Sequence, residues 1–533
     1  MVERISIKII CVLISLMFFA SCNKQTEFKE GLAGVYFSNA DFTGPKLFNI
    51  VDKLDQKWGK ENGFSTEWSV EWNGYLIAPA SDEVTIYLET NKHAKLIVNT
   101  ADTLENKNDD RNTISLNMKE GERYPLEIFY AHVDGGEGFL KLMWSWNNQQ
   151  KKIISKPNLE YSQENEAKWS WVIEPDKDKI DRNQFQNANG KNIIIAYDSN
   201  FFYGWPANQG IWSWGDEILV GLMRGNYMYD VLHHSIEKNN QVALLARSLD
   251  GGETWSIEDP ENFVTDPGKP VPLKVSIDYS DPDIAIRHHN DRFYYSYDRG
   301  KTWKGPFTFT GIDMGELTSR TDYNFIDKDT YLAFLSRIDN KVKANLPDRA
   351  FCVKTKDGGK TFQFVSWMTE TDTLRSVMSS TVRVDENHLI SAMRRRYDQP
   401  ATDKPLPQQN WIDVYESLDN GNSWKFLSKV ADTDNGTRNG NPPSLVLLKD
   451  GRICVTYGCR KVPYGIRAKI SSDNGKSWGK EIIIRDDAIS KDVGYPRSVV
   501  RPDGKVVTTY YYTTKENVSQ HIAATIWDPK DLK

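Results

Sequence analysis

Scarcities in the composition exclude several classes of protein. The 533 residues include five cysteines, and no cysteine–histidine spacing suits a zinc site. The formal net charge of -6 lacks the basic excess that nucleic-acid binding needs. The apolar run from Ile9 to Ala20 is too short to span a bilayer. We therefore expect no metal or other cofactor, no nucleic-acid partner and no membrane-spanning helix.

The N-terminus predicts a lipid anchor. Arg4 and Lys8 precede the apolar run, and Phe19-Ala20-Ser21-Cys22 ends it. These four residues resemble a bacterial lipobox, which implies that residues 1–21 are a lipoprotein signal peptide and that Cys22 is lipidated. An ordinary secretory signal is the alternative. Lipidation would attach the mature protein to the bacterial cell envelope, at the outer membrane, on either the periplasmic or the surface face.

Three cysteines remain once Cys11 leaves with the signal and Cys22 is acylated. They are Cys352, Cys454 and Cys459. An odd number argues against a disulfide framework. Their strand-like, apolar surroundings predict buried free thiols.

A phrase of eight residues recurs five times between Ser248 and Trp478. It reads Ser or Thr, any residue, Asp, any, Gly, any, Thr or Ser, aromatic. Its aspartates recur at intervals of 48 to 62 residues and are Asp250, Asp298, Asp357, Asp419 and Asp473. A spacing near fifty residues suits one four-stranded propeller blade. Because the carboxylate can accept backbone N–H groups across the turn, its pKa is expected to fall, which favours a structural over a catalytic role.

The rest of the pattern predicts an all-β chain of two domains. Residues 28–160 alternate apolar and polar side chains with a period of two, which indicates a β-sandwich. A polar linker is expected over 161–191, and a propeller over 192–533. Pairing of Asn192–Tyr197 with His521–Trp527 would close the ring. We therefore predict an N-terminal β-sandwich followed by a six-bladed β-propeller.

The first domain resembles the protective-antigen-type domain. The matching pieces are Gly31–Phe37, Phe64–Leu76 and Gly121–Leu126. The resemblance implies a carbohydrate-binding module. Sugar-binding members carry paired acidic residues and calcium before the strand that corresponds to Ala94–Val98, whereas this chain has Asn91-Lys92-His93 there. A lectin role and a spacer or docking role both stay open.

The second domain resembles the sialidase superfamily of six-bladed propellers. The resemblance lies in the five Asp boxes and in the opening strand Gly210–Val220. It implies three arginines that hold the substrate carboxylate, a tyrosine nucleophile with a glutamate partner, and an aspartate that protonates the leaving group. Tyr495 matches the nucleophile by its spacing before Asp503-Gly504, with a core tyrosine as the alternative. Arg394 matches one arginine.

The other arginine positions are matched only in part. Arg460 and Arg467 compete for the second position, and either could be a surface residue. Where sialidases have Arg-Ile-Pro, this chain has Gly204-Trp205-Pro206. Three arginines from other blades are candidates to replace the missing one: Arg224, Arg320 and Arg497.

The groups for proton transfer depart further from the family. The glutamate expected before Arg394 falls at Met378, whose neighbours Ser379 and Ser380 cannot act as a base. Candidates for the proton donor lie before Ser248 and are Asp230, His233, His234 and Glu237. Asp492, just before Tyr495, is another.

Two polar stretches have open interpretations. Arg320 and Asp322 lie two residues apart on one strand face, which predicts either a structural ion pair or a sugar-binding wall. The segment Asp434–Pro443 could line a pocket or form an interblade turn.

The resemblance implies an exo-acting glycoside hydrolase that removes a terminal, acidic sugar from glycans. Tyr495 would attack or position the anomeric carbon, and Glu237 or Asp492 would transfer protons. The expected substrate-binding residues are Arg224, Arg320, Asp322, Arg394, Arg460, Arg467 and Arg497. The alternative is a non-catalytic surface lipoprotein whose two domains only bind glycans.

Overall fold

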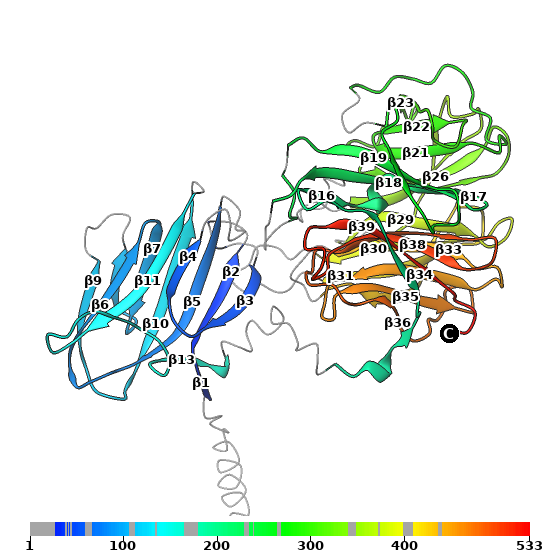
Figure 1. Ribbon diagram of the computed structural model, residues 1–533. Helices are drawn as coiled ribbons and strands as arrows, with labels where there is room; N and C mark the ends of the chain where they lie inside the picture. The colour runs from blue at the N-terminus through cyan, green and yellow to red at the C-terminus, as the bar shows by residue number, and fades with distance from the viewer. Residues whose placement is uncertain are drawn as a thin grey trace, which may run out of the picture.

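Among the described residues, the regular secondary structure is almost entirely β-strand, as predicted (Figure 1). The computed structural model describes residues 27–37, 40, 42, 45–58, 67–105, 112–133, 136–164, 180–228, 234–237, 239–263, 268–338, 348–370, 374–397, 409–434 and 440–532. Helices are short, such as η3 (Arg182–Gln184) and α3 (Pro206–Gln209). Within these ranges, no helix has the length and hydrophobicity needed to cross a membrane.

The N-terminal domain is a sandwich of two antiparallel sheets. The larger sheet has the order β1 (Phe28–Glu30), β13 (Leu159–Ser162), β5 (Trp68–Ile77), β10 (Arg123–His132), β7 (His93–Val98), β8 (Asp102–Glu105), with β2 (Leu32–Phe37) joining β5 to β3 (Pro45–Val51). The smaller sheet has the order β12 (Lys152–Ile153), β11 (Gly138–Ser145), β6 (Asp82–Thr90), β9 (Thr113–Met118), with β4 (Asp55–Trp58) beside β11.

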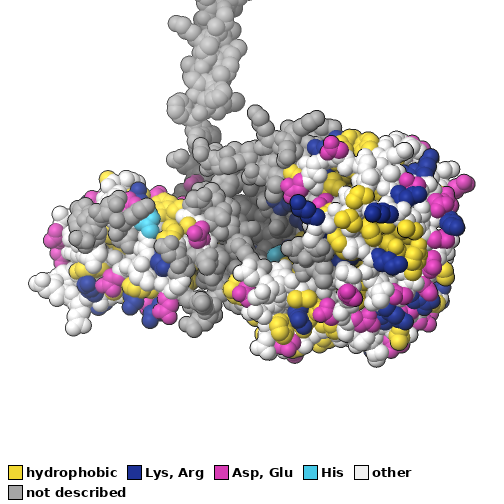
Figure 2. All heavy atoms as spheres, turned by 90° about the horizontal axis from the view of Figure 1, so that it is seen from above, with side chains coloured by type: hydrophobic (Ala, Val, Ile, Leu, Met, Phe, Trp, Pro, Cys, Tyr) yellow, Lys and Arg dark blue, Asp and Glu magenta, His cyan; other side chains and the backbone are white. Residues whose placement is uncertain are grey.

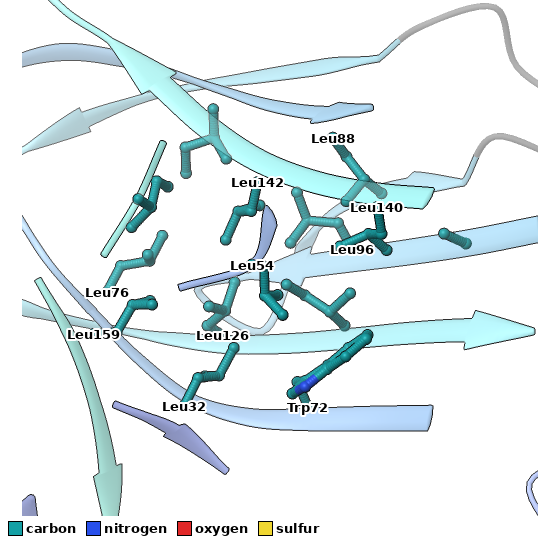
Figure 3. Packing of buried hydrophobic residues seen from close by; sticks show 14 of the residues in the cluster. Leu32, Leu54, Trp72, Leu76, Leu88, Leu96, Leu126, Leu140, Leu142 and Leu159 are labelled. Atoms are coloured by element: carbon teal, nitrogen blue, oxygen red, sulfur yellow. The ribbon is translucent and has the colours of Figure 1, made fainter. Parts of the chain in front are cut away.

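The core of the sandwich follows from the alternation of its strands. Along β5, Val70, Trp72 and Leu76 are buried, while Glu71 and Tyr75 between them are half-buried. Successive side chains of a strand point to opposite faces, so one face of each sheet turns inward. Figure 3 shows the resulting layer, in which leucines from both sheets surround Trp72.

The propeller contains six antiparallel blades among the described residues, as predicted. In ring order the first three are β16 (Phe201–Gly204), β17 (Ile211–Trp214), β18 (Glu217–Asn226), β19 (Val242–Ser248), β20 (Ser256–Glu258); β24 (Ser319–Arg320), β21 (Ala285–Asn290), β22 (Arg292–Ser296), β23 (Lys304–Thr308); and β25 (Tyr323–Phe325), β26 (Tyr331–Ile338), β27 (Asp348–Thr355), β28 (Gln363–Trp367). The other three are β29 (Arg375–Arg383), β30 (Leu389–Tyr397), β31 (Gln409–Ser417), β32 (Lys425–Asp432); β33 (Ser444–Leu447), β34 (Ile453–Cys459), β35 (Gly465–Ser471), β36 (Ile482–Arg485); and β37 (Gly494–Val500), β38 (Val506–Tyr512), β39 (His521–Trp527), β15 (Lys191–Ala196).

The ring closes in the predicted way. β15 pairs antiparallel with β39, with Asn192 opposite Thr525. The strand β14 (Gln186–Asn187) adds a parallel edge to β36. At the other end of the expected linker 161–191, Ser162 still pairs with Phe28. Both ends of that segment therefore belong to sheets.

All five Asp boxes form the same turn between the third and fourth strands of a blade. In the first box, Asp250 Oδ1 accepts the Thr254 N–H at 2.9 Å, and Oδ2 accepts the Thr254 hydroxyl at 2.6 Å. The corresponding bonds recur at Asp298, Asp357, Asp419 and Asp473. The hydrogen bond from the Thr254 hydroxyl, together with the backbone bond, lowers the pKa of Asp250 to about 2. The structural interpretation of the boxes is confirmed.

Acidic and basic side chains are interspersed on the face of the molecule shown in Figure 2. This distribution agrees with the small net charge of -6.

Candidate active site

Three residues near the propeller axis have left-handed backbone conformations. Trp205 (φ 60°) precedes α3, Met378 (φ 57°) lies in a bulge of β29, and Tyr495 (φ 49°) lies in a bulge of β37. Side chains larger than glycine seldom adopt positive φ, and such residues concentrate at functional sites. Met378 and Tyr495 also pack in one hydrophobic cluster. The position expected to hold the glutamate partner thus lies in the cluster of Tyr495 and carries an apolar side chain.

Asn441 fixes the backbone of Tyr495. Its Oδ1 accepts the Tyr495 N–H at 2.7 Å, and its side chain is fully buried. The preceding Gly494 has φ 114°, and a Cβ at Gly494 would lie only 2.0 Å from Asn441 Oδ1. The bulge therefore requires glycine at 494 and an acceptor at 441. The segment Asp434–Pro443, expected either to line a pocket or to form an interblade turn, supplies this acceptor, while its Arg438 and Asn439 lie outside the described residues.

Arginines from several blades surround the Tyr495 side chain. Arg394 Nη1 donates to the Tyr495 hydroxyl at 3.3 Å, and the Arg460 guanidinium lies 5.7 Å from the ring centroid. Burial alone would raise the pKa of Tyr495, but the charges of these two arginines together with Arg320 and Arg375 outweigh it and hold that pKa below the usual value. The four arginines therefore stabilise the ionised form of Tyr495 more than water stabilises that of an exposed tyrosine.

Two of these arginines lack a carboxylate partner. Arg394 is buried, and Arg320 is half-buried between Asn290 Oδ1 at 2.6 Å and Asn208 Oδ1 at 3.3 Å. Within the described part of the chain, no carboxylate lies within ion-pair distance of either guanidinium. Burial lowers the pKa of both arginines from its usual value, although a guanidinium stays charged in proteins. The site therefore holds excess positive charge.

The short helix α3 connects this cluster to the first blade. Asn208 binds Arg320, and the Ala207 carbonyl accepts Arg497 Nη2 at 3.0 Å. Arg497 also donates to the Thr321 carbonyl, so both its recorded bonds go to backbone oxygens. Arg497 thus holds the backbone at Ala207 and Thr321, and these bonds occupy its Nη2.

Asp322 does not pair with Arg320. Its carboxylate accepts the Thr381 N–H at 3.0 Å and the Thr381 hydroxyl at 2.9 Å. Burial raises the pKa of Asp322. Arg320 and Asp322 therefore do not form the structural ion pair that was one of their two interpretations. Asp322 instead joins two neighbouring blades.

Asp492 forms a second polar cluster beside the first. Its Oδ1 accepts His234 Nδ1 at 2.6 Å and the Tyr511 hydroxyl at 2.7 Å, and its Oδ2 accepts Gln520 Nε2 at 3.2 Å. Arg460 donates to Tyr511 and lies 3.8 Å from Asp492. Tyr511 in turn packs against Tyr495 with ring centroids 6.0 Å apart. The two clusters are therefore contiguous.

Three expected site residues lie elsewhere. Arg224 packs on the Phe201 ring at 5.0 Å, and Glu237 accepts Asn226 Nδ2 at 2.8 Å. Arg467, on the third strand of its blade, donates to the carbonyls of Pro463 and Arg485. None of these described contacts includes Tyr495. Two further proton-donor candidates, Asp230 and His233, and the expected lipidation residue Cys22 fall outside the described residues.

Arg375 was not expected at the site. It pairs with Asp348, whose side chain is completely buried, and its charge contributes to lowering the pKa of Tyr495. An arginine that opens an inner strand has no local pattern to distinguish it from a surface residue. Only the ring of blades brings Arg375 near Tyr495.

Asn91 and Lys92 occupy the place where calcium-dependent relatives of the sandwich carry acids. Asn91 Nδ2 donates to the Glu137 carbonyl, its Oδ1 accepts the Phe139 N–H, and both distances are 3.0 Å. The Lys92 ammonium donates to the Val133 carbonyl at 3.0 Å. These side chains hold two loops together, which agrees with the expected absence of the acidic pair. Across the described residues, no group of three or more His, Cys, Asp or Glu side chains could hold a metal ion.

Comparison with known proteins bears on both domains. Residues 29–160 match the PA14 domain. The PA14 domain is the protective-antigen-type sandwich described above. Residues 294–304, which contain the second of the five boxes, match the BNR/Asp-box repeat. The chain is also 24% identical over 138 residues, 24% of its length, to the anti-sigma-I factor RsgI3 of Acetivibrio thermocellus. The chain spans only 21% of the length of that relative.

The chain also has low similarity to three solved structures. A protein of unknown function from Dyadobacter fermentans is 18% identical with a TM-score of 0.48, covering 63% of this chain and 98% of that one. The NanB sialidase of Streptococcus pneumoniae is 12% identical with a TM-score of 0.42, covering 95% and 93%. An α-L-arabinofuranosidase of Fusarium graminearum is 14% identical with a TM-score of 0.41, covering 63% and 97%. At these scores the similarities carry no argument about activity.

Proposed function

We propose that the propeller is the catalytic domain of an exo-acting glycoside hydrolase that removes a terminal, acidic sugar from glycans. The observation that carries this proposal is the set of charges around Tyr495, where Arg394 and Arg320 have no carboxylate partner among the described residues. Burying unpaired charge is costly, and a substrate anion would compensate it. A carboxylate accepts the planar fork of arginine well.

The same charges prepare Tyr495 as a nucleophile. A sialidase-type tyrosine relies on a glutamate partner, and this chain has Met378 in its place. Four guanidinium groups lower the pKa of Tyr495 and so supply by electrostatics what the glutamate supplies by accepting a proton. The phenolate oxygen would attack the anomeric carbon while the arginines hold the anionic group of the sugar.

The changed arginine set predicts a changed substrate. One charge-assisted hydrogen bond contributes about 1.5–3 kcal/mol. Gly204 stands where a sialidase has an arginine, and Arg320 enters the site from another blade. The loss of one such bond, together with the different position of Arg320, would favour a different acidic sugar over sialic acid.

The deciding experiment measures sugar release from a panel of glycans that includes sialosides and uronic-acid-capped oligosaccharides. We expect release from at least one acidic substrate by the wild type and a loss of at least 10²-fold in Tyr495→Phe, which keeps the ring but removes the nucleophile. Tyr203→Phe is a matched control, because Tyr203 lies on β16 opposite Arg224 of β18. Full activity of Tyr495→Phe would refute the assignment of the nucleophile.

A surface glycan-binding protein without catalysis is the second candidate. The apolar Met378 beside Tyr495 favours it, because no carboxylate of the described residues forms a recorded hydrogen bond with the Tyr495 hydroxyl. The PA14 domain could contribute through a hollow of about 240 Å³ lined by Phe42, His93, Lys95, Glu105 and Phe129. Measurable glycan binding, unchanged in Tyr495→Phe and without sugar release, would establish this alternative.

The lipid anchor is part of the same proposal. Acylation at Cys22 would hold the enzyme at the outer membrane. Metabolic labelling with a fatty acid checks this, since Cys22→Ser should lose the label and leave the membrane fraction. Labelling that persists in Cys22→Ser would contradict it.

A further inference from the structure

Asp492 is enclosed by hydrogen-bond donors. Its side chain is 3% exposed, and three donors, His234, Tyr511 and Gln520, occupy its two oxygens. A carboxylate in this state cannot reach a glycosidic oxygen. It is suited to holding a neighbouring group in one orientation.

His234 is the exposed member of this cluster. One third of its side chain is exposed, and its Nδ1 faces Asp492 at 2.6 Å. The two ring nitrogens lie on opposite sides of the imidazole, so Nε2 points away from Asp492. The ring also meets Trp205 edge-on with centroids 5.0 Å apart.

Trp205 connects His234 to the arginine site. It is the residue immediately before α3, the helix whose Asn208 and Ala207 bind Arg320 and Arg497. On the other side, Asp492 reaches Tyr495 through Tyr511 and Arg460. His234 therefore stands beside the arginine cluster and can contact a sugar held there.

We propose that His234 is the catalytic residue that exchanges protons with the scissile glycosidic oxygen, and that Asp492 is its positioning residue. This inference rests on the proposed function. It selects His234 among the proton-donor candidates expected from the sequence, which also included Glu237 and Asp492. Glu237 bonds to Asn226 instead, and Asp492 is enclosed.

The reaction balances with these groups. The Tyr495 phenolate oxygen forms a bond to the anomeric carbon as the bond to the leaving oxygen breaks, and the electron pair stays on that oxygen. The proton on His234 Nε2 passes to the leaving oxygen and gives a neutral alcohol. A water molecule then attacks the anomeric carbon, its proton goes to Nε2, and Tyr495 leaves as phenolate. During the cycle Asp492 stabilises the positive charge that the imidazole carries when both nitrogens are protonated.

The first test compares leaving groups. The probes are the 4-nitrophenyl and the unsubstituted phenyl glycosides of N-acetylneuraminic acid and of glucuronic acid, in both anomeric forms. General acid catalysis contributes roughly 10²- to 10⁴-fold. We expect His234→Gln and Asp492→Asn to lose that factor on the phenyl glycoside and far less on the 4-nitrophenyl glycoside, which departs without a proton. His388→Gln, at a histidine that pairs with Glu416 in the turn between β29 and β30, is the matched control.

The outcomes separate the two proposals. Release from neither probe by the wild type overturns the proposed function and this assignment with it. Release that His234→Gln leaves unchanged, or reduces equally on both probes, overturns the assignment alone.

A second measurement does not depend on turnover. In ¹⁵N-labelled full-length chain, with His234→Gln to assign the signal, we expect the neutral His234 to carry its proton on Nδ1. Asp492→Asn should shift that proton towards Nε2, because the acceptor charge is lost. A wild-type ring protonated on Nε2 and bare at Nδ1 would overturn the role given to Asp492.

Discussion

The Arg394 guanidinium donates to the Tyr495 hydroxyl at 3.3 Å, across the space between the fourth and sixth blades. This contact joins an arginine that has no carboxylate partner among the described residues to the proposed nucleophile. Replacement of Arg394 should therefore change both properties of the site together.

We expect Arg394→Met to raise the pKa of Tyr495, because it removes the arginine that lowers this pKa most. The tyrosinate absorbance difference between each protein and its Tyr495→Phe version measures the shift. The variant should also lose roughly 10- to 150-fold in kcat/KM on an acidic substrate, which corresponds to about 1.5–3 kcal/mol. Arg224→Met is the control, since Arg224 packs on Phe201. An unchanged Tyr495 titration in Arg394→Met would contradict the electrostatic account.

Asn441 and Gly494 should behave as a coupled pair. Asn441→Ala leaves the buried Tyr495 N–H without its acceptor, and we expect it to cost about 1–3 kcal/mol in the free energy of unfolding. Gly494→Ala should cost more in the wild type than in Asn441→Ala, because its Cβ would meet Asn441 Oδ1 only when the asparagine is present. Urea unfolding of the four proteins in a double-mutant cycle measures the coupling. Additive costs would show that the asparagine does not set the bulge.

The fold could be predicted because its signals are local and repeated. Each Asp box closes a turn within eight residues, and the strands around it are continuous apolar runs such as Ile453–Cys459. The pairing of β15 with β39 was predictable because an early and a late apolar strand were both left without a partner. Such patterns can be recognised in the sequence without knowing how the blades are arranged around the ring.

The residues of the site could be predicted only where they lie on the inner strands of the blades. Tyr495, Arg394 and Arg460 come together, as expected. Arg467 looks equivalent to Arg460 along the chain, but it lies on β35, the third strand of its blade, away from the axis. Arg375 and the pairing of His234 with Asp492 join blades far apart in sequence, so no spacing could indicate them.

The three cysteines of the propeller should be unreactive in the folded protein. Cys352, Cys454 and Cys459 are free and buried, as predicted, and burial raises the pKa of Cys454 to about 12. Since the thiolate is the reactive form, we expect no reaction with a disulfide reagent until the chain is unfolded. Under denaturing conditions, three thiols per mature chain should then react. A fourth would indicate that Cys22 carries no lipid, and rapid reaction of the native protein would contradict the burial of the three.

The Asp boxes predict a loss of stability at low pH. The hydrogen bond from the Thr254 hydroxyl lowers the pKa of Asp250 to about 2 in the folded state, whereas an unfolded aspartate has a pKa of about 3.9. Because the folded pKa is the lower one, the box stabilises the fold fully above a pH of about 4 and loses this contribution as the pH falls through about 2. We expect Asp250→Asn to be less stable than the wild type near neutral pH and the difference to shrink in acid, as measured by denaturant unfolding at a series of pH values. Asp259→Asn, at an exposed aspartate outside the box, is the control and should show no such convergence. A difference between wild type and Asp250→Asn that stays constant down to a pH of about 2 would mean that the ionised carboxylate does not stabilise the turn.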